Sequence, residues 1–140
     1  MRTRLLLLCC CVVSYLYSVA QPINNPCSGA INITTLDGTC TTAPDIALAT
    51  EDIGPGACSA GTNENVWFTF TAQGVSAQIT VNNGPGVPEI TLINFTGGAC
   101  NPAGAVEIDC SAGAPLTVDN VLTVGNTYYV MVAFSEHYPL

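Results

Sequence analysis

The side chains that could carry chemistry are few: one histidine, ten carboxylates and eight cysteines. The histidine, His137, lies close to the end of the sequence, where chains usually fray, so a catalytic triad built on it is not expected. The carboxylates are scattered over turns and outward strand positions, which favours solvated surface charge over the paired acids of a glycosidase. The sequence therefore predicts no catalytic residue.

Two acidic pairs are candidates for a metal site. Glu51 and Asp52 precede a loop rich in glycine and proline, and Glu107 and Asp109 lie close together in a later segment. Carboxylate oxygens are ligands that calcium prefers, but about six to eight oxygens are needed around one ion. Calcium at these four residues is the one cofactor to consider, and no other cofactor is predicted.

Aromatic side chains offer a second kind of site. Trp67, Tyr128 and Tyr129 have broad apolar rings, on which a sugar ring could stack. Within alternating strands such residues more often belong to the core or to a sheet face. The sequence leaves both interpretations open, a sugar platform and a structural role.

The only basic side chains stand at the very start of the sequence. Arg2 and Arg4 precede the apolar run 5–13, and Ser18 and Ala20 are the small residues of a cleavage site. This layout is typical of a secretory signal peptide, residues 1–20, cut after Ala20. Cleavage leaves ten carboxylates without a single Lys or Arg, a net charge of −10. We therefore expect a secreted or cell-surface protein that binds neither nucleic acid nor an anionic membrane.

Five cysteines follow the predicted cleavage site, and an exported chain should hold most of them as disulfides. Cys100 and Cys110 flank one short segment and are expected to pair. Cys40 and Cys58 are the next pair expected, which would tie the early strands to a later loop. Cys27 is then left unpaired.

The rest of the sequence consists of short alternating runs separated by Gly, Pro and Asn, without a helical period. In the clearest run, Val66, Phe68 and Phe70 share one face, and Trp67 lies on the other. The pattern predicts a single all-β domain, an antiparallel β-sandwich or jelly roll. The expected strands are 30–34, 45–49, 66–71, 76–81, 90–95, 105–110, 116–122 and 127–134.

Short motifs follow one another in a characteristic order: NPCSGA at 25–30, GTCT at 38–41, GPGAC at 54–58, NVWFTFTA at 65–72, GAC at 98–100 and LTVGNTYYV at 122–130. The series resembles the β-sandwich modules akin to the bacterial pre-peptidase C-terminal domain, found in secreted and surface proteins of gliding-type Gram-negative bacteria. The polar, Pro-containing segment 21–26 is expected to be a lead-in to a single domain at 27–140, and the resemblance implies that this domain lacks its closing strand. It thereby implies an open sheet edge beside 127–134, and a Cys27 that awaits a cysteine on the missing strand.

The function expected from this resemblance is a non-catalytic exported module for adhesion, substrate contact or spacing at the cell surface or outside the cell. Its partner would be a polysaccharide or a surface protein. Two alternatives stay open: an accessory-domain fragment of a larger secreted peptidase or glycoside hydrolase, and a structural subunit that self-associates through the open sheet edge.

Overall fold

The structure is a computed structural model of the chain. It describes residues 20–34, 36–38, 41, 46, 48–53, 58, 64–82 and 86–134. His137 and Cys40, which entered the sequence-based predictions, lie outside these ranges.

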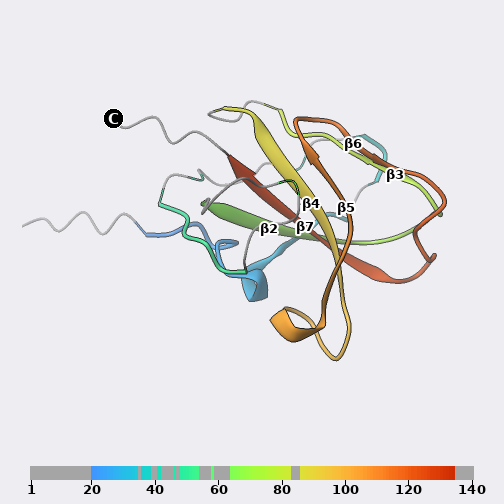
Figure 1. The fold of residues 1–140 in the computed structure, drawn as a ribbon, viewed down its shortest axis with the longest axis horizontal. Coiled ribbons are helices and arrows are strands. Elements are labelled where there is room, and N and C mark those ends of the chain that lie inside the picture. The colour runs from blue at the N-terminus through green and yellow to red at the C-terminus, as the bar shows by residue number, and fades with distance from the viewer. Residues whose placement is uncertain are drawn as a thin grey trace, which may run out of the picture.

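The described residues form strands and two single-turn 3-10 helices, so the predicted all-β class is confirmed (Figure 1). The elements are η1 (Cys27–Gly29), β1 (Ile31–Asn32), β2 (Asn65–Thr71), β3 (Ala77–Ile79), β4 (Pro88–Phe95), η2 (Pro102–Gly104), β5 (Ala105–Ala112), β6 (Leu116–Val118) and β7 (Thr127–Phe134).

Two sheets are built from these strands. The larger sheet has the order β1-β2-β7-β4-β5, in which the short β1 runs parallel to β2 and every other pair is antiparallel. The smaller sheet pairs β3 with β6, antiparallel, and lies beside the larger sheet (Figure 1). Strands β4 and β5 are consecutive and form a hairpin, whereas the pairs β2 with β7, β4 with β7 and β3 with β6 join strands that are not consecutive in the chain.

One face of the larger sheet packs against the smaller sheet. Val66, Phe68 and Phe70 of β2 lie on this face, as the alternation predicts. They form one apolar cluster with Leu116 and Val118 of β6. The other buried members of this inner cluster are Ala49, Ala72, Ile90, Leu92, Leu122, Tyr128, Val130 and Val132.

The opposite face of the larger sheet carries a second, smaller cluster. Its buried members are Cys27, Trp67, Ile93 and Met131. Trp67 is completely buried there, so the larger sheet is covered on both faces at this position. We call this set the outer cluster.

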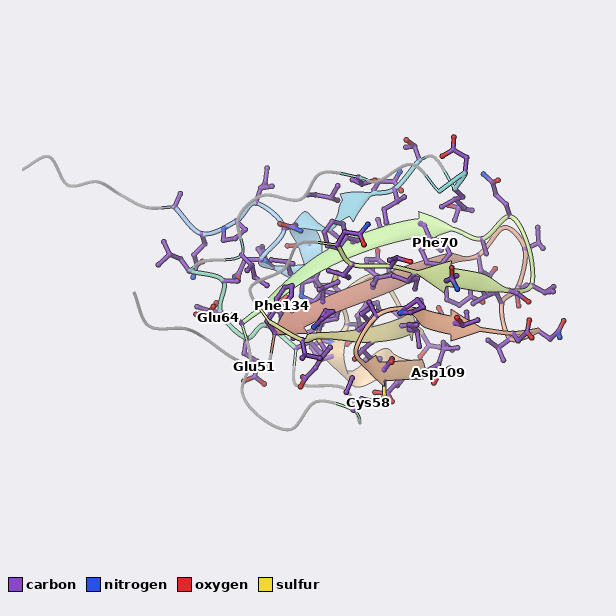
Figure 2. The ribbon with its side chains drawn as sticks, turned by 90° about the horizontal axis from the view of Figure 1, so that it is seen from above. Glu51, Cys58, Glu64, Phe70, Asp109 and Phe134 are labelled. Carbon is purple, nitrogen blue, oxygen red and sulfur yellow. A yellow bond between two sulfur atoms is a disulfide. The ribbon has the colours of Figure 1, made fainter. Side chains whose placement is uncertain are left out.

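Strand β7 lies in the middle of the larger sheet and not at its edge. It pairs with β2 from Thr127 to Ala133 and with β4 from Tyr129 to Phe134. Figure 2 shows Phe70 and Phe134 at opposite ends of these antiparallel neighbours. The predicted open edge beside 127–134 is therefore wrong, because the long alternating strand is paired on both sides.

The residues predicted as a lead-in belong to the folded domain. Asn24 and Asn25 are buried, and Trp67 N donates a hydrogen bond to the Asn24 carbonyl at 2.8 Å. Asn24 Nδ2 donates in return to the Trp67 carbonyl at 3.1 Å. The segment thus extends the pairing of the β2 edge, and the boundary placed before Cys27 is wrong.

The expected strand at 45–49 is not formed by those of its residues that the structure describes. Ala49 N donates to the Ile46 carbonyl at 2.8 Å, which closes a turn, and Leu48 has a positive φ of 76°. Ile46 and Ala49 still pack on the inner cluster, so the alternation reports burial correctly but not the backbone conformation.

The disulfides differ from the predicted pairing. Cys27 is bonded to Cys100, and Cys58 to Cys110, with Cα–Cα distances of 5.6 and 5.8 Å. Both expected pairs, Cys100 with Cys110 and Cys40 with Cys58, are therefore wrong, as is the unpaired Cys27. Cys110 lies on β5 and Cys100 in the turn before it, and the fold brings a distant segment to each. Figure 2 shows Cys58 beside the β5 residue Asp109.

Peptide mapping without reduction tests this connectivity. No Lys or Arg follows Arg4, so trypsin is of no use, and proteases that cut at acidic or aromatic residues are needed. We expect linked peptides that contain Cys27 with Cys100 and Cys58 with Cys110. A peptide that joins Cys100 to Cys110 would contradict the structure.

Removing the first bridge should also destabilise the fold. The double variant Cys27→Ser with Cys100→Ser releases a link between residues 73 positions apart. We expect its free energy of unfolding to fall by about 2–4 kcal/mol, mainly because the unfolded chain gains freedom. Denaturant unfolding measures this free energy. The double variant Cys58→Ser with Cys110→Ser, which releases a link between residues 52 positions apart, is the control for the loss of any one disulfide. An unchanged midpoint for the Cys27/Cys100 variant would show that the bridge is dispensable.

Candidate functional site

The first wall of the candidate site is η1, a single turn that carries Cys27 and Ser28. The turn is held by its backbone: Gly29 N donates to the Pro26 carbonyl at 2.8 Å, and Cys27 N donates to Asp52 Oδ2 at 2.6 Å. A Cβ on Gly29 would lie 2.1 Å from the Ile23 carbonyl oxygen. Glycine is required here because the two backbones approach too closely for any side chain.

The second wall is the turn between β4 and β5, which carries Ala99 and Cys100. Gly97 and Cys100 both have positive φ, 81° and 58°, so the chain reverses tightly there. Thr96 N donates to the Gly104 carbonyl at 2.8 Å and closes the loop at its base. The Cys27–Cys100 disulfide then joins the two walls, which fixes their separation.

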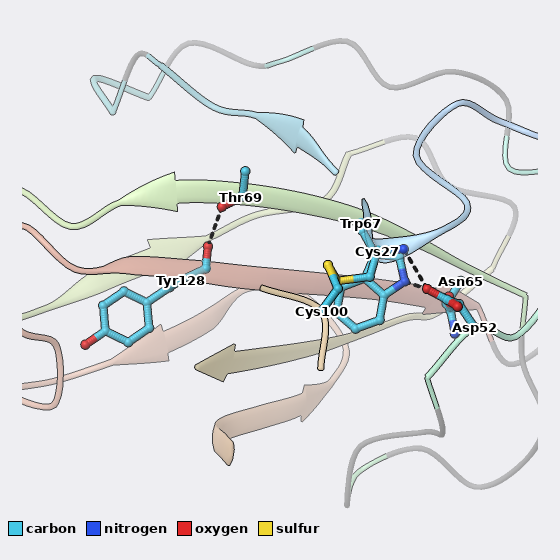
Figure 3. Close-up of a disulfide and its surroundings, with 7 residues drawn as sticks. All are labelled: Cys27, Asp52, Asn65, Trp67, Thr69, Cys100 and Tyr128. Atoms are coloured by element: carbon cyan, nitrogen blue, oxygen red, sulfur yellow. Dashed lines mark hydrogen bonds between the residues drawn. A yellow bond between two sulfur atoms is a disulfide. The ribbon is translucent and has the colours of Figure 1, made fainter. Parts of the chain in front are cut away.

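The outer face of the larger sheet forms the floor. Tyr129 of β7 pairs in register with Thr69 of β2, so their side chains are neighbours across the strands. The rings of Phe95 and Tyr129 pack nearly perpendicular to each other, with their centroids 5.0 Å apart. The Thr69 hydroxyl donates to the Tyr128 carbonyl at 3.0 Å (Figure 3). The ring and the hydroxyl are thereby held in place by their neighbours.

Between the walls and the floor lies an open depression of about 240 Å³. Tyr129, Thr69 and Ser28 supply its polar groups, and the lining is completed by Cys27, Ala30, Ala99 and Cys100. No lining residue is charged. The depression can therefore offer a half-buried aromatic ring and two hydroxyls to a small neutral ligand, beside a rigid disulfide.

The structure separates the three aromatic residues predicted as a sugar platform. Trp67 is fully buried in the outer cluster, where its indole Nε1 donates to Asn65 Oδ1 at 3.1 Å (Figure 3). Tyr128 points into the inner cluster, and its hydroxyl accepts a hydrogen bond from Thr123 N at 2.9 Å. Only Tyr129 is left at a surface depression. Strand alternation explains this, because Tyr128 and Tyr129 are adjacent and must face opposite sides of the sheet.

The four acidic residues considered for calcium stay in two separate pairs. Asp52 accepts from Cys27 N, and Asp109 Oδ1 accepts from Cys110 N at 2.8 Å, so both carboxylates already serve the local backbone. Glu51 and Glu107 are exposed. Within the described ranges, no three His, Cys, Asp or Glu side chains gather as metal ligands do.

Two residues of the depression, Ser28 and Thr69, were not predicted from the sequence. Thr69 lies on the same strand face as Trp67, a signal that the alternation contains but that does not by itself indicate a site. Ser28 adjoins Cys27, which the disulfide joins to Cys100 on the opposite wall, and a wrong disulfide assignment hides that proximity.

Comparison with protein-family models, with curated proteins and with solved structures found no match for the chain. The resemblance described from the motifs thus stays a prediction. In the described ranges, the chain has no helix of the length and apolar character needed to cross a membrane.

Truncating Trp67 separates its structural role from a binding role. Trp67→Ala removes a fully buried ring and leaves Asn65 Oδ1 without its donor, so the free energy of unfolding should fall by about 3–5 kcal/mol. Denaturant unfolding measures the loss, and Val124→Ala, at an exposed position, is the control that should change little. A variant with unchanged stability that had lost binding to a glycan would restore the platform hypothesis for Trp67.

Proposed function

We propose that this chain is an exported, non-catalytic β-sandwich or jelly-roll module that contacts a neutral polysaccharide through the depression beside Cys27 and Cys100. Its role is adhesion, substrate contact or spacing at the cell surface or outside the cell. The observation that carries the proposal is the position of Tyr129, a half-buried ring at the floor of a depression with rigid walls. Two sheets that share one apolar cluster support the sandwich architecture.

Export is supported by the chemistry of the cysteines and of the first segment. Two disulfides join distant parts of the chain, and such bonds persist in oxidising compartments outside the cytosol. The start of the sequence combines Arg2 and Arg4, an apolar run and a small-residue cleavage site. Neither feature depends on the other, and both favour an exported chain.

The choice of a neutral sugar follows from charge and size. The chain has ten carboxylates and no Lys or Arg beyond Arg4, so an anionic polysaccharide would be repelled and would meet no lysine or arginine to bind it. The depression has a volume of about 240 Å³, which suits one small ring and is too small for an extended peptide. A sugar ring would stack on Tyr129 and exchange hydrogen bonds with the Ser28 hydroxyl. It would donate to the Thr69 hydroxyl, whose own proton is given to the Tyr128 carbonyl.

The accessory-domain alternative uses the same depression. As part of a larger secreted peptidase or glycoside hydrolase, the module would hold the substrate for a catalytic domain, and Tyr129 would keep the same role. The self-association alternative loses its sequence-based support, since β7 is paired on both sides. We therefore propose sugar contact as the function, whether or not the module is attached to a catalytic domain.

Binding of the oxidised chain to immobilised neutral polysaccharides tests the proposal. Tyr129→Ala removes the stacking ring and should weaken binding about fivefold, the equivalent of about 1 kcal/mol for an aromatic contact. Tyr129→Phe keeps the ring and should retain most of the affinity. Gln78→Ala, at an exposed position on β3 in the other sheet, is the control that should bind like the unchanged chain.

Thermal unfolding of each variant must accompany the binding measurement, because Tyr129 also contacts Phe95. The proposal fails if no neutral polysaccharide binds. It also fails if Tyr129→Ala binds as well as the unchanged chain while its melting temperature is the same.

A further inference from the structure

The chain enters the folded body at Pro22, the second residue after the predicted cleavage site. Pro22, Asn24 and Asn25 are buried, whereas Ala20 and Gln21 are exposed. Asn25 N donates to the Pro22 carbonyl at 2.9 Å, which fixes the backbone at this point. A chain cut after Ala20 begins at Gln21, and this residue lies just outside the packed segment.

We propose that Gln21 is a modification site, where the first residue of the exported chain closes to a pyroglutamyl ring. This inference rests on the export in the proposed function, because only cleavage after Ala20 frees the α-amine of Gln21. The amine and the side-chain amide then belong to one residue, at a spacing that gives a five-membered ring. The reaction is intramolecular and so avoids the entropy of bringing two molecules together.

The step balances without an oxidant or a co-reactant. The α-amine attacks the side-chain carbon Cδ, a new N–Cδ bond forms and the Cδ–Nε2 bond breaks. Ammonia leaves with the proton that the amine gives up. The product is a lactam that keeps the side-chain carbonyl and has no basic nitrogen. Asparagine at this position would need a strained four-membered ring and cannot follow the same course.

The contacts of Gln21 allow the change without repacking. Among the residues that the structure describes, its Nε2 donates to Thr50 Oγ1 alone, at 3.4 Å and in an exposed position. Thr50 is held independently by Asn25, whose Nδ2 donates to Thr50 Oγ1 at 3.2 Å and whose Oδ1 accepts from Thr50 N. Loss of Nε2 as ammonia thus leaves Thr50 and Asn25 joined, and the buried segment stays in place.

The consequence is large because the chain has no lysine, the two basic residues being Arg2 and Arg4. After cleavage the α-amine of Gln21 is the only primary amine, and at neutral pH it carries a positive charge. Ring closure removes both the primary amine and its positive charge. The exported protein then offers no amine to exopeptidases that need a free α-ammonium, and no Lys or Arg to proteases that cut after basic residues.

Intact-mass measurement on the chain recovered from an exporting host tests the inference. The full sequence, with its own first 20 residues, is expressed as it stands and as Gln21→Asn. We expect the unchanged chain to begin at residue 21 and to be lighter by the mass of one ammonia. Reductive methylation should then add nothing to it, whereas the Gln21→Asn chain should keep its ammonia and gain methyl groups at its α-amine.

Native isoelectric focusing gives a second readout, in which the cyclised chain should run as the more acidic by one charge. A chain that begins at Gln21 with its full mass and a methylatable amine would overturn the inference while leaving export intact. A chain that begins elsewhere, or that keeps residues 1–20, would overturn it together with the cleavage on which it rests. The intact mass of the recovered chain shows at which residue it begins, and so distinguishes these two failures.

Discussion

The structure depends on the central position of β7. This strand is paired along most of its length with β2 on one side and β4 on the other, so its backbone groups are satisfied without water. Its side chains alternate between two apolar clusters: Val130 and Val132 enter the inner one, and Met131 the outer one. A polar substitution at any of these positions would disturb one cluster, while a shift of register by one residue would exchange both.

The candidate site follows from the second of these clusters. A sheet with a solvated outer face would leave Trp67 and Met131 in water, and here that face is covered by the segment from Pro22 to Gly29 and by the β4–β5 turn. Neither of these two segments is a regular strand. The first is held by the side-chain amide of Asn24 and by the close backbone approach at Gly29, and the Cys27–Cys100 disulfide joins it to the second. The depression is the place where the two covers meet without closing over Tyr129.

Sequence alone was sufficient to predict the strands in which buried and exposed side chains alternate regularly. The alternation in β2 and β7 predicted both the strands and the faces of Val66 and Trp67, because side-chain direction in a strand has a period of two. It was insufficient where contacts join distant segments. Cysteine spacing does not determine which loops the sheet order brings together, so the disulfides were assigned wrongly, and with them the proximity of Ser28 to Tyr129. The open edge beside β7, which the resemblance implied, is also wrong, because strand order is a property of the whole sheet.

The proposed sugar contact also sets a limit on affinity. One aromatic ring and two hydroxyls in an open depression give a ligand few partners, and a free energy of about −4 kcal/mol corresponds to a Kd of about 1 mM. A contact of this strength holds a polymer only when several act together on one chain of sugars, because each further contact is then intramolecular. Rigid walls help in that setting, since a depression already formed by the Cys27–Cys100 bridge has little entropy to lose on each encounter. A small, neutral and preformed site therefore suits a module that works in numbers or beside a second binding or catalytic unit.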